Sequence, residues 1–206
     1  MILRSYRARV AMRTVGVVAV AFAVLSCQST RISEVWTPKT PHSGTFKRLM
    51  IVALAPTPGA RVQYENDFVD KLSNVHVLAI ASSNVVADVA EINRKTVEAW
   101  MQEFRLDGVI VTRVIDVERQ TEYIPPNYTM GGWYGAWAVP TSPGRVVEST
   151  TISLETDLFD AKTEKLVYSA VTKTFDPSSR SKAIHDVIDA LAKDMTKRGL
   201  LPKSSS

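Results

Sequence analysis

The segment "GVIVTRVIDVE" (residues 108–118) decides the predicted fold. Its first half is apolar at nearly every position, which is typical of a strand buried on both faces in the middle of a sheet. Two further apolar runs precede it, "FKRLMIVALAP" (46–56) and "NVHVLAIAS" (74–82), and the first ends at a Pro-Thr-Pro-Gly turn. These two runs predict two more strands.

Helical patterns follow these strands in the chain. Apolar residues at helical spacing mark residues 61–72, and a second stripe begins after Asn93, a good N-cap, and ends before Gly108. A third helix is expected to begin with Asp176 as N-cap and Pro177 in its first turn, and to end at Gly199. On its solvated side, two pairs have the i,i+4 spacing of ion pairs: Asp189–Lys193 and Asp194–Arg198.

The chain after residue 144 predicts an antiparallel strand pair. "RVVESTTISLETDLFDA" (145–161) alternates between apolar and polar residues, and "KLVYSAVTKTF" (165–175) returns after a short turn. Right-handed crossovers between the earlier strands then give the sheet order 2-1-3-4-5, numbered along the chain. We therefore predict a single α/β (α+β) domain over residues 46–201, with a mixed five-stranded sheet and three helices packed on it, followed by a tail at 202–206.

The N-terminal residues have the pattern of a secretory signal. Four arginines precede the apolar run Val15–Leu25, which is too short to span a bilayer. The run leads into "VLSC", which resembles a bacterial lipobox with Cys27 as the residue that becomes lipidated. The resemblance implies a signal peptide over residues 1–26, acyl chains on Cys27 and, because Gln28 follows, an outer-membrane location facing the periplasm. An ordinary signal with an incidental cysteine is the alternative, and either Met1 or Met12 fits as the start.

The charge of the mature chain excludes a basic nucleic-acid footprint. Four of the 25 basic residues and none of the 21 acidic residues lie in residues 1–26, which leaves 21 of each sign. Residues 28–45 are rich in Ser, Thr and Pro and show no periodicity, so residues 27–45 are predicted to be the lipidated cysteine and a flexible tether. With one cysteine in the chain, no intramolecular disulfide can form.

No motif in the sequence predicts catalysis. Ser179 and Lys182 have the S-x-x-K spacing but lack the companion motifs of penicillin-interacting enzymes. His185 and Asp189 would supply only two ligands to a metal ion. We therefore expect no catalytic residue, no metal site and no cofactor. Two carboxylate pairs are the remaining candidates for acid/base catalysis: Asp116 with Glu118, and Glu155 with Asp157. Solvated strand faces produce such pairs routinely.

The segment "YIPPNYTMGGWYGAWAVPTSPG" (residues 123–144) is the best candidate for a functional site. It carries no charged residue and is predicted to be a long hairpin excursion between the third and fourth strands; long ordered loops are often functional. Aromatic side chains dominate binding hot spots. Its rings could contact a partner, pack on their own sheet or lie at the lipid headgroup layer. The candidate contact residues are Tyr123, Tyr128, Trp133, Tyr134 and Trp137.

Two blocks of the sequence resemble a known group of proteins. "DGVIVTRVIDVERQTEYIPP" (107–126) and "TISLETDLFDAKTEKLVYSAVTKTFDPSS" (151–179) are similar to corresponding blocks in a widespread family of uncharacterised bacterial envelope lipoproteins. More distantly, the order of strands and helices is similar to that of the TolB N-terminal domain, the curli-secretion lipoprotein CsgG and the penicillin-binding-protein activator LpoB. These resemblances imply binding and assembly rather than catalysis.

The sequence therefore leads to three hypotheses about function. The first is a non-catalytic, lipid-anchored envelope protein that docks a protein partner through the aromatic hairpin. The second is an envelope glycan-processing or ligand-binding enzyme, for which carboxylates such as Asp116, Glu118 and Glu155 would have to converge on a concave site. The third is a structural lipoprotein that forms homo-oligomers through the hairpin. None of the three involves nucleic acid.

Overall fold

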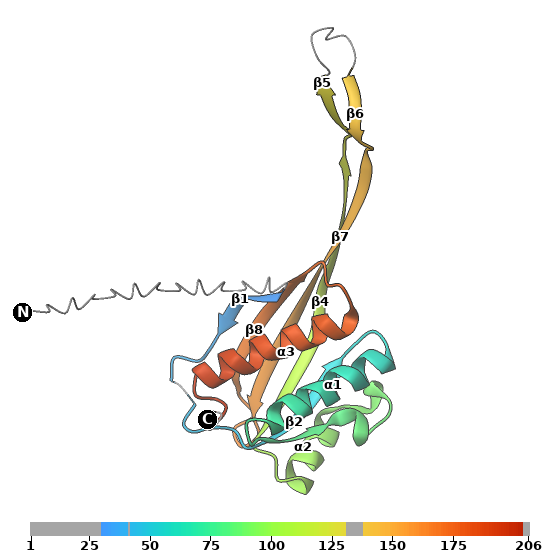
Figure 1. Ribbon diagram of the computed structural model, residues 1–206. Helices are drawn as coiled ribbons and strands as arrows, with labels where there is room; N and C mark the ends of the chain where they lie inside the picture. Colours follow the sequence, from blue (N-terminus) through green and yellow to red (C-terminus); the bar gives the residue numbers. More distant parts are fainter. Residues whose placement is uncertain (1–29, 41, 131–137, 204–206) are drawn as a thin grey trace, which may run out of the picture.

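The computed structural model describes residues 30–40, 42–130 and 138–203. Its main feature is a six-stranded sheet with the order β1-β8-β7-β4-β2-β3 (Figure 1). The strands of this sheet are β1 (Thr30–Trp36), β2 (Arg48–Leu54), β3 (Leu78–Ala81), β4 (Gly108–Ile124), β7 (Arg145–Asp160) and β8 (Leu166–Phe175). The α-helices are α1 (Pro58–Ser73), α2 (Arg94–Glu103) and α3 (Arg180–Lys197), and two short 3₁₀ turns, Ser82–Asn84 and Val89–Glu91, lie between β3 and α2.

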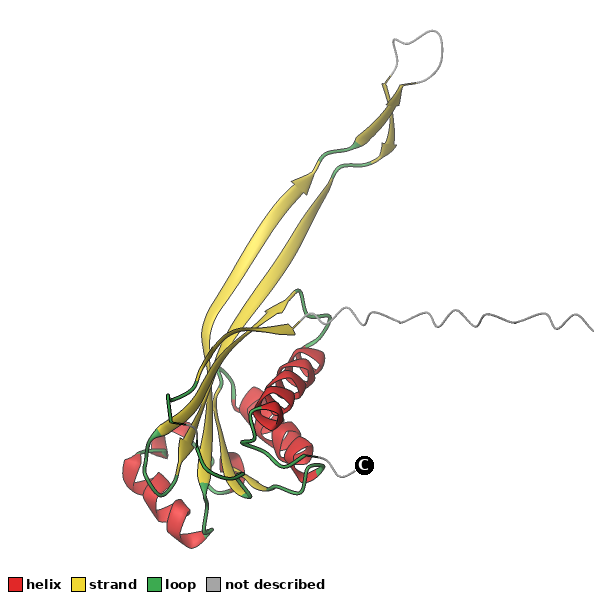
Figure 2. Ribbon diagram, turned by 90° about the vertical axis from the view of Figure 1, so that its left-hand side faces the viewer, coloured by secondary structure: helices red, strands yellow, loops and turns green. Residues whose placement is uncertain are grey.

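The helices cover both faces of the sheet because β2 is apolar on both of its faces. Leu49, Ile51 and Ala53 pack into the larger core cluster with residues of α1 and α3. The alternate residues Met50 and Val52 pack into a second cluster with Trp100 of α2. Figure 2 shows the helices on opposite sides of the sheet. The predicted mixed α/β (α+β) class with three helices is thus confirmed for the described part of the chain.

The sheet has one strand more than predicted. Within it, β2 pairs in parallel with β3 and β4, and β7 pairs antiparallel with β4 and β8. The sixth strand, β1, pairs antiparallel with β8 and comes from the segment predicted to be a flexible tether. The tether prediction is therefore corrected for residues 30–36. The physical reason is that β1 covers the edge of β8, whose backbone groups would otherwise be unpaired.

The last helix begins three residues later than predicted. Ser179 is its N-cap, and the Ser179 Oγ accepts a hydrogen bond of 3.1 Å from the Lys182 backbone N–H. The predicted N-cap Asp176 instead has a left-handed φ of 41°, which is incompatible with the extended N-cap conformation. The predicted Asp194–Arg198 pair is present at 2.7 Å, whereas the Asp189 carboxylate pairs with Lys71 of α1.

None of the helices in the described ranges combines the length and the apolar character that a membrane span requires.

Candidate functional site: the projecting ribbon

The β4 and β7 strands extend far beyond the rest of the sheet as a two-stranded ribbon (Figures 1 and 2). The pairing of β4 with β2 ends at Arg113, and the pairing of β7 with β8 ends at Thr151. After a bulge at residue 115, β4 and β7 continue in register for nine pairs, from Asp116–Ser153 to Ile124–Arg145. At about 3.3 Å per residue, these nine pairs span roughly 30 Å, and β8 still flanks the first three of them, at residues 151–153 of β7. We call residues 116–124 and 145–153 the projecting ribbon.

The two faces of the projecting ribbon differ in chemistry. Because paired residues of an antiparallel ribbon point to the same face, the register places the apolar pairs Val117–Ile152 and Tyr123–Val146 on one face, separated by the polar pairs Arg119–Thr150 and Thr121–Glu148. Tyr123 and Val146 are 63% and 61% exposed, among the most exposed large apolar residues of the described chain. The opposite face carries acidic and neutral polar residues in its first rows, including Asp116, Glu118, Gln120, Glu122, Ser149 and Ser153.

The Tyr123 side chain lies across the ribbon toward Gly144. A Cβ atom on Gly144 would come within 2.5 Å of the Tyr123 Oη and 3.0 Å of the Pro126 Cδ. Only glycine leaves this space open, so the Tyr123 ring can lie along the neighbouring strand. Among the predicted contact residues, Tyr123 thus packs beside Gly144 of its own ribbon, while more than half of its surface remains exposed.

The ribbon continues beyond Tyr123 into a second pair of strands. β5 (Asn127–Met130) and β6 (Ala138–Ser142) pair antiparallel, with Tyr128 opposite Pro140. Within the described part of the segment 123–144, residues 123–124 thus belong to β4, and residues 127–130 and 138–142 form the β5–β6 pair. Four of the predicted site residues lie outside the described residues: Cys27, Trp133, Tyr134 and Trp137.

An apolar pocket of about 340 Å³ lies at the base of the ribbon, which we call the ribbon-end pocket. Its walls come from the C-terminal end of β2, the first turns of α1 and α3, and the neighbouring parts of β4, β7 and β8. This is where ligands bind in many open sheets, outside the carboxyl ends of parallel strands. Val114 and Ile152 line the pocket and stand at the start of the ribbon, so the two features adjoin.

The hydroxyl groups beneath the ribbon-end pocket are bonded to one another. The Tyr64 hydroxyl shares a hydrogen bond of 3.1 Å with the Thr112 hydroxyl, which shares one of 3.0 Å with the Thr156 hydroxyl. Burial raises the pKa of Tyr64 to about 12, and the hydrogen bonds with the two threonines oppose that rise. Tyr64 is thus a neutral, hydrogen-bonded wall residue across the physiological pH range.

The structure does not bring the candidate catalytic residues together. Glu155 is bound to Arg113 at 2.6 Å, and none of the four candidate carboxylates lines the ribbon-end pocket. Ser179 caps a helix, and the Lys182 Nζ lies 2.8 Å from the Asp186 carboxylate. Among the described residues, no group of three or more His, Cys, Asp and Glu side chains is arranged to hold a metal ion.

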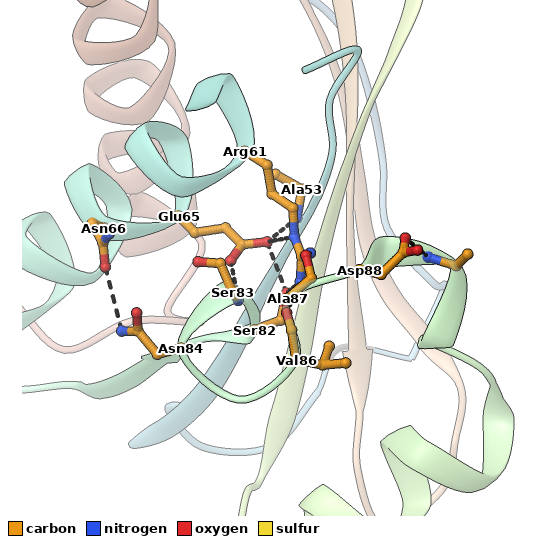
Figure 3. A network of polar contacts seen from close by, with 11 residues as sticks. Ala53, Arg61, Glu65, Asn66, Ser82, Ser83, Asn84, Val86, Ala87 and Asp88 are labelled. Atoms are coloured by element: carbon orange, nitrogen blue, oxygen red, sulfur yellow. Dashed lines mark hydrogen bonds and ion pairs between the residues drawn. The ribbon is translucent and has the colours of Figure 1, made fainter. Parts of the chain in front are cut away.

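Sequence reasoning missed a buried polar network at the end of β2 (Figure 3). Arg61 and Glu65 of α1 are 3% and 0% exposed and pair at 3.2 Å. Glu65 accepts hydrogen bonds from the Ala53 N–H, the Ser82 hydroxyl and the Ser83 N–H, at 2.7–2.8 Å. Arg61 donates to the Val86 and Ala87 carbonyls and to the Ser82 hydroxyl. The i,i+4 spacing was the only signal of this network in the sequence, and its bonds fasten the segment after β3 to α1.

Comparison with known proteins finds similarity at the level of backbone structure. No family model matches the chain, and no curated protein matches it. A PelC dodecamer from Paraburkholderia phytofirmans is 14% identical, covering 83% of this chain and 98% of that one, with a TM-score of 0.45. The lipoprotein GNA1162 from Neisseria meningitidis is 15% identical, covering 73% and 99%, with a TM-score of 0.44.

Protein XCC0632 from Xanthomonas campestris, assigned to the uncharacterised family DUF330, is 15% identical over 80% of this chain and 94% of that one, with a TM-score of 0.39. The solved structures similar to this chain thus include a bacterial lipoprotein. The resemblance to TolB, CsgG and LpoB stays a prediction. Because these TM-scores are 0.45 and below, none of the three proteins extends a function to this chain.

Proposed function

We propose that the protein is a non-catalytic binding module of the bacterial envelope, anchored by lipid on Cys27, that docks a partner protein through the projecting ribbon. The observation that carries the proposal is the nine-pair stretch of β4 and β7 in which Tyr123 and Val146 are exposed side by side. The aromatic residues predicted to make contact at the tip, Trp133, Tyr134 and Trp137, are part of the proposal. Its location at the outer membrane, facing the periplasm, rests on the lipobox resemblance and Gln28.

The energetics of a bare ribbon favour a binding role. A two-stranded antiparallel ribbon is at best marginally stable in water on its own. Within the described ranges, no third strand pairs with residues 119–124 or 145–150. Exposed apolar side chains on such an element mark an interaction surface, and its open strand edges can accept a further strand from a partner. A partner would therefore stabilise the ribbon by covering Tyr123 and Val146 and by pairing with a free edge.

Crosslinking in cells tests the proposal. The variant Tyr123→Ser/Val146→Ser removes the exposed apolar pair, and Trp133→Ala/Trp137→Ala removes two predicted tip contacts. Leu78→Ser is the matched control, since Leu78 is 66% exposed on β3, which forms the far edge of the main sheet. We expect both double variants to lose the crosslinked partner while Leu78→Ser retains it.

The identity of the crosslinked species separates the hypotheses. A partner that persists in both double variants contradicts docking through the ribbon. A product that consists of two copies of this chain supports the self-associating structural protein instead. Far-UV circular dichroism of each purified variant checks that the domain remains folded, so that loss of the partner is not a consequence of unfolding.

A further inference from the structure

The ribbon-end pocket is mostly apolar. Most of its lining is aliphatic, including Leu54, Val114, Ile152 and Ile184. Among its polar lining residues, Tyr64 and Thr112 bond to each other and Arg113 pairs with Glu155, whereas Ser179 and Arg180 are exposed to solvent; no carboxylate lines it. Among the described residues, the buried side-chain polar atoms without a partner belong to Asp67 and Ser83, and neither residue lines this pocket.

The volume of the pocket is that of a small ligand site. At about 340 Å³, it lies near the lower end of the range of about 300–1,000 Å³ found for ligand pockets. A hydrophobic chain gains most from such a site, because burying apolar surface is favourable and no hydrogen bond to water is lost. A polar ligand would lose hydrogen bonds to water in the aliphatic part of the pocket without replacement.

The start of β1 lies beside this pocket. The Thr30 hydroxyl shares a hydrogen bond of 2.8 Å with the hydroxyl of Thr174, and Thr174 is one of the lining residues. Cys27 precedes Thr30 by three residues, a stretch that reaches at most about 10 Å when fully extended. The attachment point of a group on Cys27 is therefore within this reach of Thr30, whose partner Thr174 lines the pocket.

We propose that the ribbon-end pocket holds one acyl chain of the lipidated Cys27. The proposal rests on the lipid anchor of the proposed function and adds that one of its chains is bound by the protein. The remaining acyl chains stay in the bilayer, and multiple chains are what stable anchoring requires.

Photolabelling of the intact lipoprotein in its membranes tests this inference. Cells are fed a diazirine-bearing fatty acid, which enters the acyl chains of lipoproteins and inserts into neighbouring atoms on irradiation. We expect mass spectrometry to find intramolecular crosslinks, in which the labelled acyl chain is joined to peptides of the same molecule that contain pocket residues such as Ala60 and Ile184. The pocket-filling variant Ala60→Phe is expected to reduce this label to background. Val62→Phe, two residues away at a position 43% exposed and outside the pocket, keeps the label.

The failure of this inference and that of the lipid anchor give different results. If the protein carries photoreactive acyl chains that crosslink only to phospholipid, the anchor stands and the pocket proposal is overturned. If Cys27 carries no acyl chain, the anchor fails and the pocket proposal fails with it. Should Ala60→Phe misfold, Ala183→Phe fills the pocket from α3, and unchanged label in that variant would equally overturn the inference.

Discussion

Gly108 lies directly against the ring of Phe46. A Cβ atom on Gly108 would be 2.7 Å from the Phe46 Cδ1 and 2.9 Å from the Leu49 Cδ2. Phe46 is 1% exposed and stacks on His42, so its ring cannot move aside without disturbing other contacts. We expect Gly108→Ala to lower the free energy of unfolding by about 1–3 kcal/mol, the usual cost of overpacking a core. Urea denaturation measures the change.

Gly59 provides the matched control for this substitution. It lies in the first turn of α1, and a Cβ atom there meets no heavy atom within 4 Å. Gly59→Ala is therefore expected to raise stability by about 0.4–1 kcal/mol, because alanine has fewer conformations to lose on folding. Equal effects at the two glycines would contradict the close packing inferred at Gly108.

The buried Arg61–Glu65 pair makes a second prediction. Arg61→Met leaves the Glu65 carboxylate buried without its counter-charge, which typically costs about 3–5 kcal/mol. The double variant Arg61→Met/Glu65→Gln removes both charges and is expected to lose less stability than the sum of the two single variants. A double-mutant cycle by urea denaturation measures this coupling.

An exposed pair of the same spacing is the control for that cycle. Arg94 and Glu98 of α2 form an i,i+4 ion pair at 2.6 Å, with the Arg94 side chain 77% exposed. Arg94→Met should change stability little, because solvent screens exposed pairs. Additive losses at Arg61 and Glu65 would show that the network is not a single cooperative unit.

The order of the central strands could be predicted from the sequence, whereas the edge strand could not. The apolar run at residues 108–113 predicts a central strand, and the crossover rule then fixes its neighbours. β1 has the composition of a linker, and its place in the sheet depends on pairing with residues more than 130 positions away, such as Thr30 with Thr174. The composition of residues 30–36 does not indicate a pairing partner so far away in the sequence.

The candidate site was likewise visible only in part. The uncharged aromatic segment predicted a hairpin excursion beginning at Tyr123. From residue 150 toward the ribbon tip, β7 no longer pairs with β8, because β8 ends while β4 and β7 continue. The ribbon therefore begins before the aromatic segment. The polar alternation of β7 is the same within the sheet and beyond it, so periodicity does not reveal where the third strand stops. The ribbon-end pocket, assembled from elements far apart in the sequence, has no local pattern at all.

Tyr64 should ionise only at high pH. Its pKa is raised to about 12 by burial, above the value of 10.0 of an unperturbed tyrosine. A raised pKa in the folded state means that the contribution of Tyr64 to stability is complete below pH 10 and is lost as the pH rises toward 12. Phenolate absorbance, compared between the native protein and Tyr64→Phe, is expected to differ only in the step near pH 12. A difference near pH 10 would mean that Tyr64 is exposed to solvent.

Asp160 should give the opposite dependence on pH. Partial burial opposes its ionisation, but hydrogen bonds from the Thr163 hydroxyl and backbone N–H, with the nearby His42, lower the pKa of Asp160 below the ordinary 3.8. A lowered pKa in the folded state means that the carboxylate contributes stability above pH 3.8, and that this contribution is lost as the pH falls through the lower folded value. Asp160→Asn keeps an acceptor for Thr163 but loses the charge.

We therefore expect Asp160→Asn to be less stable than the native protein at pH 7, by on the order of 1 kcal/mol, and the difference to shrink as the pH is lowered below 3.8. Urea denaturation at a series of pH values measures it. Asp157→Asn makes the same chemical change on the same strand without touching Thr163, and it is the matched control for the loss of stability at pH 7. A stability difference for Asp160→Asn that stays constant down to about pH 2 would show that the charge of this carboxylate plays no part in holding the turn between β7 and β8.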